Sequence, residues 1–448
     1  SKIVPVFKKG DKRTVSNYRP ISVLSSLSKV IEKLFVDRLS NYLSKFNILH
    51  PCQFGFRSGS STSLALVSLL DYLKKSIDSG KFVGSVFLDL TKAFDTINHA
   101  TLFNKLEAYG VTGAPLTFLK NYLHNREWSV YVSGASSETK LINQGVPQGS
   151  ILGPLLFIIY INDLVDAIKS THCVLYADDT TIIAAEDSLT ALTLHLNNTL
   201  LDISKWCYEN QLIINPAKTK FMIFRSAQRP LPFHQPLTLG PHSIPTCDTV
   251  IFLGVHLDCH LKFNLHTNHL RKKTAFGIRA IIKAREVFHI NVLMSLYFAF
   301  IHSHIMYGIA AWGNTYDCHL SPIQNIQNQA IRIITNSSRY SSAGHLLQDN
   351  KILPVRKLFF YSIAVLLFQL RNALLPFEFI DSVFLQNNNV TRFAMNLNFL
   401  LPASRTNYGK MTTAYAAITF WNNMPLSVKT MPTLSSFKKS LKSFLLSY

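Results

Sequence analysis

The sequence predicts an α+β fold with a mostly antiparallel sheet in its middle and a helical C-terminal part. Two observations lead to this prediction. Between residues 83 and 257, short apolar runs typical of buried strands alternate with longer segments whose apolar residues recur at helical spacing. Beyond Asp258 the strand-like runs stop, and helical patterns continue to about residue 380. Strands followed by a run of helices are typical of an α+β architecture.

The elements are expected in a definite order. Residues 1–85 combine a basic, proline-punctuated opening, a polar loop and two helix candidates, of which the first is marked by Leu27, Ile31, Leu34 and Leu39. The elements expected next are a buried strand at 83–89, helices at 98–108 and from Pro115, a hairpin arm at 128–132, a glycine-rich loop at 144–153, an apolar helix at 155–164, a helix at 189–206, and strand-like runs at 220–224 and 250–257.

The composition indicates a folded protein with an anionic partner. The chain has 448 residues, of which 48% are hydrophobic and 16% charged, enough for about two to four structural units with their own cores. Lys and Arg number 45 against 25 Asp and Glu, which gives a formal net charge of +20. A surplus of this size points to a polyanionic partner, and nucleic acid is the first candidate.

Cysteine spacing and the length of the apolar runs exclude several classes of protein. The six cysteines form no CxxC pair, so we expect neither a zinc knuckle nor a disulfide framework, and a reducing intracellular compartment fits best. The longest apolar runs, at residues 155–161 and 359–370, are too short to span a bilayer, so no membrane association is expected. Because the chain opens on Ser1 rather than Met, we expect a fragment and draw nothing from the missing signal peptide.

Two adjacent acids form the first candidate site. The tetrapeptide Tyr176-Ala177-Asp178-Asp179 lies between the apolar runs Val174-Leu175 and Ile182-Ile183, which predicts a tight hairpin with both acids at its tip. Adjacent carboxylates repel each other unless a cation neutralises them, and oxygen-only ligands favour magnesium. A solvated Asp-Asp turn is the alternative interpretation of the pair by itself.

A third acid, Asp89, ends the apolar run of residues 83–89. A strand that delivers one acid beside a hairpin that delivers two more is suited to hold two magnesium ions, which activate an attacking 3′-hydroxyl and stabilise a leaving pyrophosphate. The alternative role for Asp89 is a structural cap at the strand end. Asp95, six positions later, is assigned to structure.

With these acids in place, the chain resembles the reverse transcriptases of non-LTR (LINE-type) retrotransposons. The matching segments occur in that family's order over roughly 250 residues. They are NYRPIS from Asn17, QFGFRSG from Gln53, VFLDLTKAFDTINH from Val86, QGVPQGSILGPLLF from Gln144, YADD from Tyr176, NPAKTKFMIF from Asn215 and FLGVHLD from Phe252.

The resemblance implies a right-hand polymerase fold and an RNA-directed DNA polymerase activity. Fingers are expected at 1–85, an antiparallel-sheet palm at 86–258 with a fingers insertion near 98–143, a helical thumb at 259–345, and a helical C-terminal extension of unknown role at 346–448. The expected partners are an RNA template, a DNA primer or RNA–DNA hybrid, and dNTPs. The family also implies transposition and access to the nucleus.

The resemblance assigns roles to the acids and to a basic loop. Asp89 and Asp178 would ligate two Mg²⁺ ions, with Mn²⁺ possible, and Asp179 would support them. Arg19 would bind the triphosphate of the incoming nucleotide as a fork. The lysine that assists Arg19 would come from Lys8, Lys9 and Lys12, and we assign Lys12. A merely solvated basic loop is the alternative for each individual lysine.

Further nucleotide contacts are implied at three positions. Phe94, five positions after Asp89, would pack beneath the sugar and exclude a 2′-hydroxyl, although a core phenylalanine is the alternative. Gln148 would hydrogen-bond the nucleotide or the template strand. Gly149 would let the backbone approach the nucleotide closely.

Other implied roles carry less sequence specificity. Lys218 is a candidate general acid for the pyrophosphate, with Lys220 or a plain surface lysine as alternatives. A turn formed by Phe252, Leu253 and Gly254 resembles the primer grip, which positions the primer 3′ end. Arg57 either binds the template backbone or structures its own loop.

A basic helical stretch follows the expected palm. Arg271, Lys272, Lys273 and Arg279 are interleaved with apolar residues and almost no acids, which predicts a helix packed by one face and laid along a duplex by the other. In the family this region grips an RNA–DNA hybrid; a solvated basic helix is the alternative.

For the chain as a whole, an RNA-templated RNA polymerase and a catalytically decayed nucleic-acid-binding remnant stay open, although Phe94 argues against the first and the intact motifs against the second.

Overall fold

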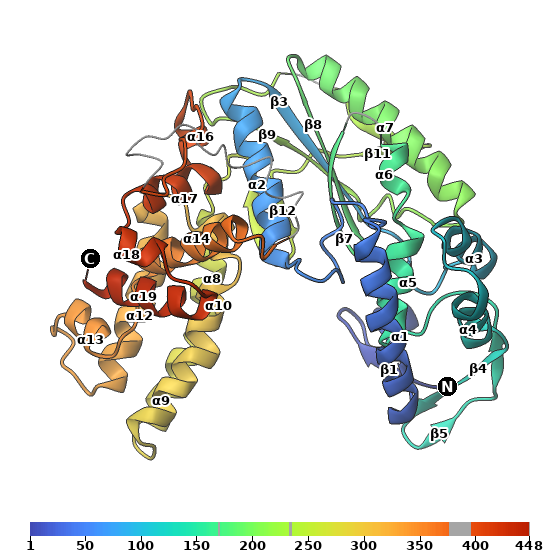
Figure 1. The fold of residues 1–448 in the computed structure, drawn as a ribbon, viewed down its shortest axis with the longest axis horizontal. Coiled ribbons are helices and arrows are strands. Elements are labelled where there is room, and N and C mark those ends of the chain that lie inside the picture. The colour runs from blue at the N-terminus through green and yellow to red at the C-terminus, as the bar shows by residue number, and fades with distance from the viewer. Residues whose placement is uncertain (169–170, 233–234, 376–395, 448) are drawn as a thin grey trace.

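The computed structural model describes residues 1–168, 171–232, 235–375 and 396–447. Its elements form an arch (Figure 1). The strands are β1 (Lys2–Phe7), β2 (Tyr18–Val23), β3 (Phe82–Leu88), β4 (Arg126–Val132), β5 (Ala135–Ser136), β6 (Lys140–Ile142), β7 (His172–Tyr176), β8 (Asp179–Glu186), β9 (Lys220–Phe224), β10 (Leu237–Leu239), β11 (His242–Ile244), β12 (Thr249–Phe252) and β13 (Val255–Asp258).

The helices occupy both limbs of the arch and cover the sheet at its top (Figure 1). In the first part of the chain they are α1 (Ser26–Lys45), α2 (Thr62–Asp78), α3 (His99–Ala108), α4 (Gly113–Leu123), α5 (Leu152–Tyr160), α6 (Leu164–Ala167) and α7 (Leu189–Glu209). In the second part they are α8 (Asn264–Ala284), α9 (Ile290–Tyr297), α10 (Ser303–Met306), α11 (Ile309–Trp312), α12 (Asp317–Ile334), α13 (Ala343–Asp349), α14 (Val355–Arg371), α16 (Asn407–Lys410), α17 (Thr413–Asn422), α18 (Leu426–Lys429) and α19 (Leu434–Ser447).

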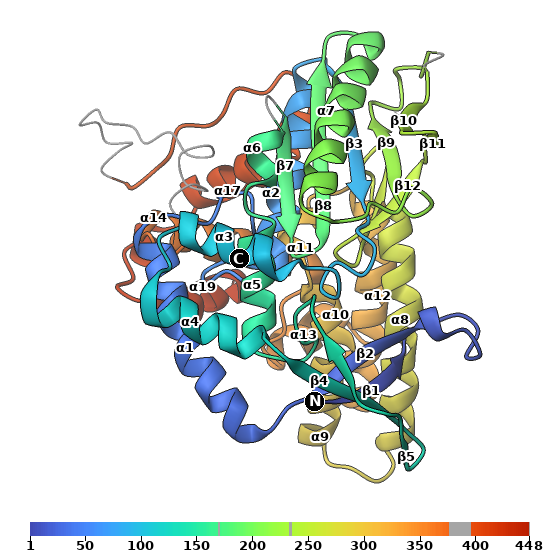
Figure 2. The ribbon, with the colours of Figure 1, turned by 90° about the vertical axis from the view of Figure 1, so that its right-hand side faces the viewer.

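The central sheet has four strands in the order β7-β8-β3-β9, and all of its pairs are antiparallel. Successive side chains of a strand point to opposite faces, so Val86 and Ile182 pack in one hydrophobic cluster while Val83 and Ile183 pack in another. Helix α7 lies along one face of this sheet (Figure 2), and its buried residues belong to the same cluster as Val86. The predicted α+β architecture with an antiparallel sheet is therefore confirmed.

A second sheet joins the start of the chain to residues 126–142. Its order is β2-β1-β4-β5, with β6 also paired to β4. β1 and β2 form an antiparallel hairpin, whereas β1 and β4 run parallel. The basic opening of the chain is thus a rigid ribbon rather than a free arm.

The two helices expected within residues 1–85 differ in their surroundings. Both are present, but Leu27 and Leu34 of α1 are 72% and 63% exposed, so part of the apolar pattern that predicted α1 does not pack. α2 is buried along most of its length and joins a different hydrophobic cluster from α1. The expected limit at residue 85 also falls inside β3, and the domain limits as a whole stay predictions.

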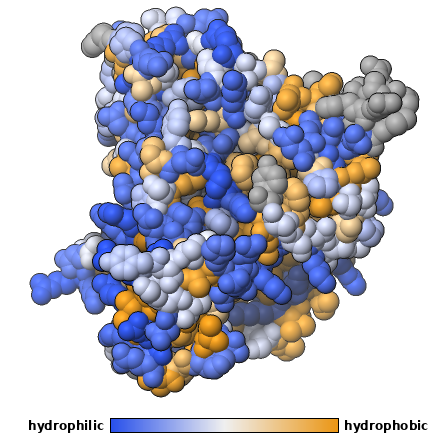
Figure 3. Space-filling model, turned by 90° about the vertical axis from the view of Figure 1, so that its left-hand side faces the viewer, coloured by the Kyte–Doolittle hydropathy of each residue, from blue (hydrophilic) through white to orange (hydrophobic). Residues whose placement is uncertain are grey.

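Helix α2 fixes the C-terminal segment through its charged residues. The Asp71 carboxylate accepts hydrogen bonds from the backbone N–H groups of Thr413 (2.7 Å) and Ala414 (3.0 Å). One turn further on, Lys74 donates to the carbonyl of Met411 at 2.7 Å. Because these groups are buried, they hold residues 411–414 firmly on α2. The outer face of this limb mixes hydrophilic and hydrophobic residues (Figure 3).

Several local expectations change in the structure. The run at 250–257 is not one strand, because a two-residue turn at Leu253-Gly254 divides it into β12 and β13. The small hairpin β10–β11 had no counterpart among the expected elements. Part of the helical pattern expected up to residue 380 lies outside the described residues. Within the described ranges, no helix combines the length and the hydropathy needed to cross a membrane.

Candidate active site

The register of the central sheet brings the three acids together. β7 and β8 form the expected hairpin, in which Tyr176 pairs with Asp179 and Ala177-Asp178 form the turn. β3 pairs with β8 so that Leu88 lies opposite Thr180. Asp89 directly follows Leu88, so the strand end and the hairpin tip deliver their acids to the same edge of the sheet.

The three carboxylates influence one another. Loss of surrounding water, together with the charges of Asp178 and Asp89, raises the pKa of Asp179 to about 6. The same loss of water raises the pKa of Asp178, with a smaller contribution from Asp89. Both turn acids keep solvent-accessible surface, so a ligand from solution has access to them. Three adjacent carboxylates repel one another when all are ionised, so such a cluster favours a bound cation.

Positive side chains face this cluster from the first ribbon. The charges of Arg19 and Lys8 lower the pKa of Asp178, against the dominant effect of burial. Arg19 lies opposite Val6 in the β1–β2 hairpin, and Lys8 is two residues beyond Val6, so the two cations share one face of the ribbon. Lys12 instead places its Nζ 5.8 Å from the ring centre of Phe7.

Lys218 is positioned beside Asp89 by a short turn. Asn215 donates its backbone N–H to the carbonyl of Asp89 at 2.8 Å, and its own carbonyl accepts from the N–H groups of Lys218 and Thr219. The Lys218 Nζ consequently lies 3.6 Å from Asp89 Oδ2. A cation on the third acid is thus supplied by the chain itself.

The donor set suits a hard divalent cation by its chemistry, since it consists of carboxylate oxygens. Within the described residues, however, no group of three or more His, Cys, Asp or Glu side chains is gathered closely enough to hold a metal ion. The acids therefore adjoin one another without forming a finished ligand cage.

The loop that contains Gln148 packs against the first ribbon. Gln148 donates its side-chain Nε2 to Asp95 Oδ1 at 2.8 Å, so Asp95, assigned to structure, holds this amide. Gly149 has φ +108°, and a Cβ there would lie 2.9 Å from the carbonyl oxygen of Ser22. The close backbone approach at this glycine is thus to β2. Phe94 is half-buried and stacks on Phe157 with ring centroids 4.5 Å apart.

The turn at residues 252–254 lies on the same side of the fold. Leu253 and Gly254 have φ +43° and +79°, as a two-residue hairpin turn with both central residues left-handed requires. Phe252 is buried, and its ring lies 5.9 Å from that of Phe87 in β3. The hydroxyl of Tyr307 donates to the carbonyl of Leu253 at 2.7 Å.

The remaining candidate residues fall into two groups. Arg271, Lys272, Lys273 and Arg279 are exposed on α8, while the opposite face of that helix is buried. This agrees with a helix packed by one face only. Arg57 donates Nη1 to the carbonyl of His50 at 3.2 Å, which favours a loop-structuring role among the alternatives.

Comparison with protein families decides the class. The family model "Reverse transcriptase (RNA-dependent DNA polymerase)" matches residues 7–257, more than half of the 448-residue chain. The chain belongs to the reverse transcriptase family. The resemblance to the enzymes of non-LTR retrotransposons is confirmed by its relatives.

Two relatives come from Drosophila melanogaster. The "Probable RNA-directed DNA polymerase from transposon BS" is 29% identical, over 76% of this chain and 38% of that protein. The "RNA-directed DNA polymerase from mobile element jockey" is 27% identical, over 78% of this chain and 39% of that protein. This reverse transcriptase chain thus spans less than half the length of these relatives. A solved telomerase from Candida albicans, in complex with a fragment of telomeric RNA, is 13% identical over 78% of this chain and 61% of its own, with a TM-score of 0.39.

Sequence reasoning missed some features of this reverse transcriptase site. The sequence favours Lys12 as the partner of Arg19, whereas in the structure Lys8 acts on Asp178; a two-residue strand period does not separate these lysines, because they lie four positions apart. Tyr307 and Gln53 contact the two turns through long-range packing, for which the sequence holds no local signal. Their contacts emerge only from the fold.

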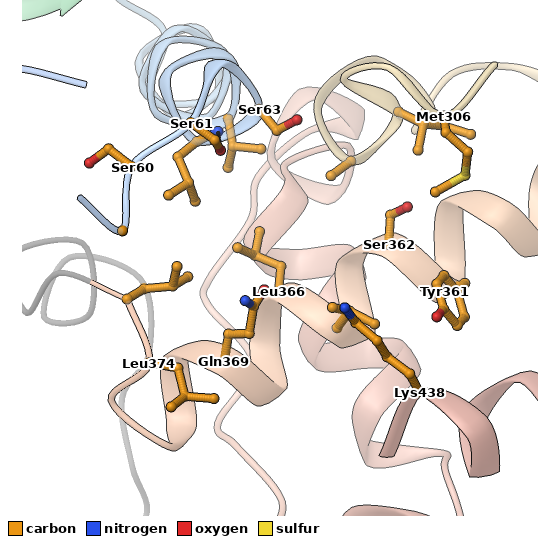
Figure 4. A pocket seen from close by; sticks show the side chains of 17 residues that line it. Ser60, Ser61, Ser63, Met306, Tyr361, Ser362, Leu366, Gln369, Leu374 and Lys438 are labelled. Carbon is orange, nitrogen blue, oxygen red and sulfur yellow. Dashed lines mark hydrogen bonds between the residues drawn. The ribbon is translucent and has the colours of Figure 1, made fainter. Parts of the chain in front are cut away.

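A pocket with a volume of about 540 Å³ lies away from the acids. Its walls come from the start of α2, from α10 and α11, and from α14, with Ser60, Met306 and Leu366 among the side chains that face it (Figure 4). None of the candidate residues named above lines it. The acids instead lie where β3 ends beside the β7–β8 turn, and the two turn acids are exposed to solvent.

Proposed function

We propose that this reverse transcriptase is the RNA-directed DNA polymerase of a retrotransposon. It would transfer nucleotides from dNTPs onto a DNA 3′ end opposite an RNA template. The observation that carries the proposal is the meeting of Asp89, Asp178 and Asp179 at one sheet edge, with Arg19 and Lys8 facing them. Two turn acids whose pKa values are raised partly by the neighbouring carboxylate charges, next to cations, suit a triphosphate that arrives with metal ions.

Asp89 and Asp178 would hold two Mg²⁺ ions with the support of Asp179; Mn²⁺ is an alternative of the same charge. Bound in this place, such ions supply Lewis acidity to the attacking hydroxyl and to the leaving phosphate oxygens. The chain contributes the rigid placement of the acids on β3 and the β7–β8 hairpin. Lys218, now paired with Asp89, would move its ammonium to the leaving group and give it a proton.

The β1–β2 ribbon would bind the triphosphate. Arg19 presents a planar fork to phosphate oxygens, and a lysine provides a point charge. Lys8 fits this second role because it already acts on Asp178 and Asp179, whereas the Nζ of Lys12 lies 5.8 Å from the ring centre of Phe7. Both lysines are exposed.

The sugar and the template strand would meet the other face of the site. Phe94 stacks on Phe157, which limits its movement, so its exposed edge could exclude a 2′-hydroxyl. Gln148, held by Asp95, would contact the nucleotide or template, with Gly149 keeping the loop close to β2.

The primer and hybrid would lie along the limb of the arch that contains α8, α12 and α14, which we call the second limb (Figure 1). In this assignment residues 1–85 with the insertion near 98–143 act as fingers, 86–258 as palm and 259–345 as thumb. The turn at Phe252, Leu253 and Gly254 would position the primer end. The exposed basic residues of α8 would bind phosphates of the hybrid without reading sequence, so affinity should fall steeply with salt.

Primer extension tests the proposal. The chain is supplied with poly(rA), oligo(dT), Mg²⁺ and labelled dTTP, and we expect incorporation that Asp178→Ala lowers by a factor on the order of 10³ or more. Asp202→Ala, which removes an exposed acid of α7, is the matched control and should retain full activity. Equal incorporation by Asp178→Ala and the parent would remove the two-metal assignment.

Two rival functions are separated by the same assay. An RNA-templated RNA polymerase would accept ribonucleotides as readily as deoxynucleotides. In the proposed function the parent rejects ribonucleotides, and Phe94→Ala relaxes that selection. A decayed binding remnant would bind an RNA–DNA hybrid in a salt-sensitive way and incorporate nothing.

A further inference from the structure

The outer strand of the central sheet, β7, is covered next to the acids by a loop at residues 52–54. β7 is an edge strand, and residues 52–54 run alongside it, with Gln53 and Leu175 in a parallel bridge. The N–H of Phe54 donates to the carbonyl of Leu175, and the N–H of Leu175 donates to the carbonyl of Cys52, both at 2.8 Å. These bonds fix the loop against β7 up to the hairpin turn.

The side chain of Gln53 continues this contact into the turn. It is 1% exposed, and its Oε1 accepts the N–H of Ala177 at 3.2 Å and that of Gly55 at 2.8 Å. Because both neighbours are donors, only the oxygen end of the amide satisfies them. The Nε2 end is buried without a partner among the described residues, so the hydrogen bonds of this amide lie at its oxygen end, with Gly55 and Ala177.

The turn itself needs support. Ala177 has φ +57° and is buried, a conformation that L-residues other than glycine adopt at a cost. Strain of this kind persists only where the surroundings over-determine it. Gly55 contributes, since a Cβ there would lie 2.4 Å from the N atom of Ala177, so the loop backbone packs directly on the turn.

We infer that Gln53 is a positioning residue for the acids of the turn. Its amide oxygen holds the N–H of Ala177 and thereby fixes the backbone that carries Asp178 and Asp179. Gln53 touches neither nucleotide nor metal; it acts through Ala177. The inference rests on the proposed function for its effect on activity, because a displacement of about 1 Å at reacting groups costs on the order of 100-fold in rate.

The test compares Gln53→Met, which keeps length and loses the acceptor, with Gln53→Glu, which retains an acceptor oxygen. Gln327→Met is the matched control, because Gln327 is also fully buried but hydrogen-bonds Tyr297 and Leu353 in the second limb. We expect Gln53→Met to lower kcat at least tenfold and to raise the Mg²⁺ concentration for half-maximal rate, with KM for the primer–template unchanged. Gln53→Glu should restore part of kcat, and Gln327→Met should leave the Mg²⁺ requirement near the parent value.

A second readout does not depend on activity. Hydrogen exchange of a peptide that covers residues 172–180 should speed up in Gln53→Met, but neither in Gln53→Glu nor in Gln327→Met. Unchanged exchange and an unchanged Mg²⁺ requirement in Gln53→Met would overturn the inference while leaving the proposed function intact. Faster exchange in Gln53→Met, combined with a parent protein that incorporates no nucleotide, would retain the structural role of Gln53 and reject the proposed function.

Discussion

Two hairpin turns of this fold, one with the acids and one proposed to position the primer end, are held in different ways. The turn at Ala177-Asp178 is packed by the backbone of Gly55 and by the buried amide of Gln53. The turn at Leu253-Gly254 has left-handed residues as well, but its external hydrogen bond comes from Tyr307, whose side chain is 41% exposed.

The two turns should differ in how well they tolerate an added side-chain atom. Close packing by backbone leaves no space for an added atom, since a main chain cannot rotate away as a side chain does. At Gly254 the nearest atoms to an added Cβ belong to the Tyr307 ring, at an ordinary 3.5 Å. We therefore expect the first turn to be sensitive to single atoms and the second to adjust.

The largest expected effect is that of Gly55→Ala. Its Cβ would lie 2.4 Å from the N atom of Ala177, so the loop or the turn must shift, at a cost of about 1–3 kcal/mol in the free energy of unfolding. Incorporation in the primer-extension assay should fall on the order of 100-fold.

Gly254→Ala is the matched variant at the other turn. It meets no close atom, and its positive φ costs about 1 kcal/mol. Thermal unfolding and primer extension should both place it nearer the parent than Gly55→Ala. The reverse order would refute the contrast between the turns.

A pH-dependent effect is expected at the first turn only. The pKa of Asp179 is raised to about 6 by loss of water and by Asp178 and Asp89. At pH values between the ordinary pKa of an aspartate and about 6, the folded state binds more protons at Asp179 than the unfolded state does. Asp179 therefore destabilises the metal-free fold above pH 6, and this destabilisation disappears as the pH falls.

Thermal unfolding of the metal-free protein measures this effect. Asp179→Asn should melt above the parent at pH 7.5, and the gap should close as the pH falls through 6 towards 4. Tyr307→Phe should show no such pH-dependent gap. A gap that is constant from pH 7.5 to 4.5 would contradict the assignment of the repulsion to this turn.

The smallest expected effect is that of Tyr307→Phe. It removes one partly exposed hydrogen bond, worth about 0.5–1.5 kcal/mol, and leaves the ring in place against Gly254. We expect KM for the primer–template to rise less than tenfold with kcat unchanged, measured by titrating the hybrid at saturating dTTP. A loss as large as that of Gly55→Ala would show that the two turns are held equally tightly.

Much of the fold follows from local patterns. The strand that ends at Asp89 and the hairpin around Asp178 were predictable because apolar runs flank the acids, and the structure contains both elements. The helix α1 was predictable as a helix but not in its environment, since a pattern marks which face is apolar and not whether a partner covers it. Leu27 and Leu34 show this limit.

The sequence by itself determined most of the secondary elements, the positive charge, the membership of the reverse transcriptase family and the three candidate acids. Only the tertiary structure decided that Lys8 rather than Lys12 faces Asp178, that Asp95 holds Gln148, and that Gln53 supports the turn. The hydrogen bond between Gln53 and Ala177, for example, joins residues 124 positions apart. Such pairings depend on sheet register and helix packing, which no local pattern of side chains encodes.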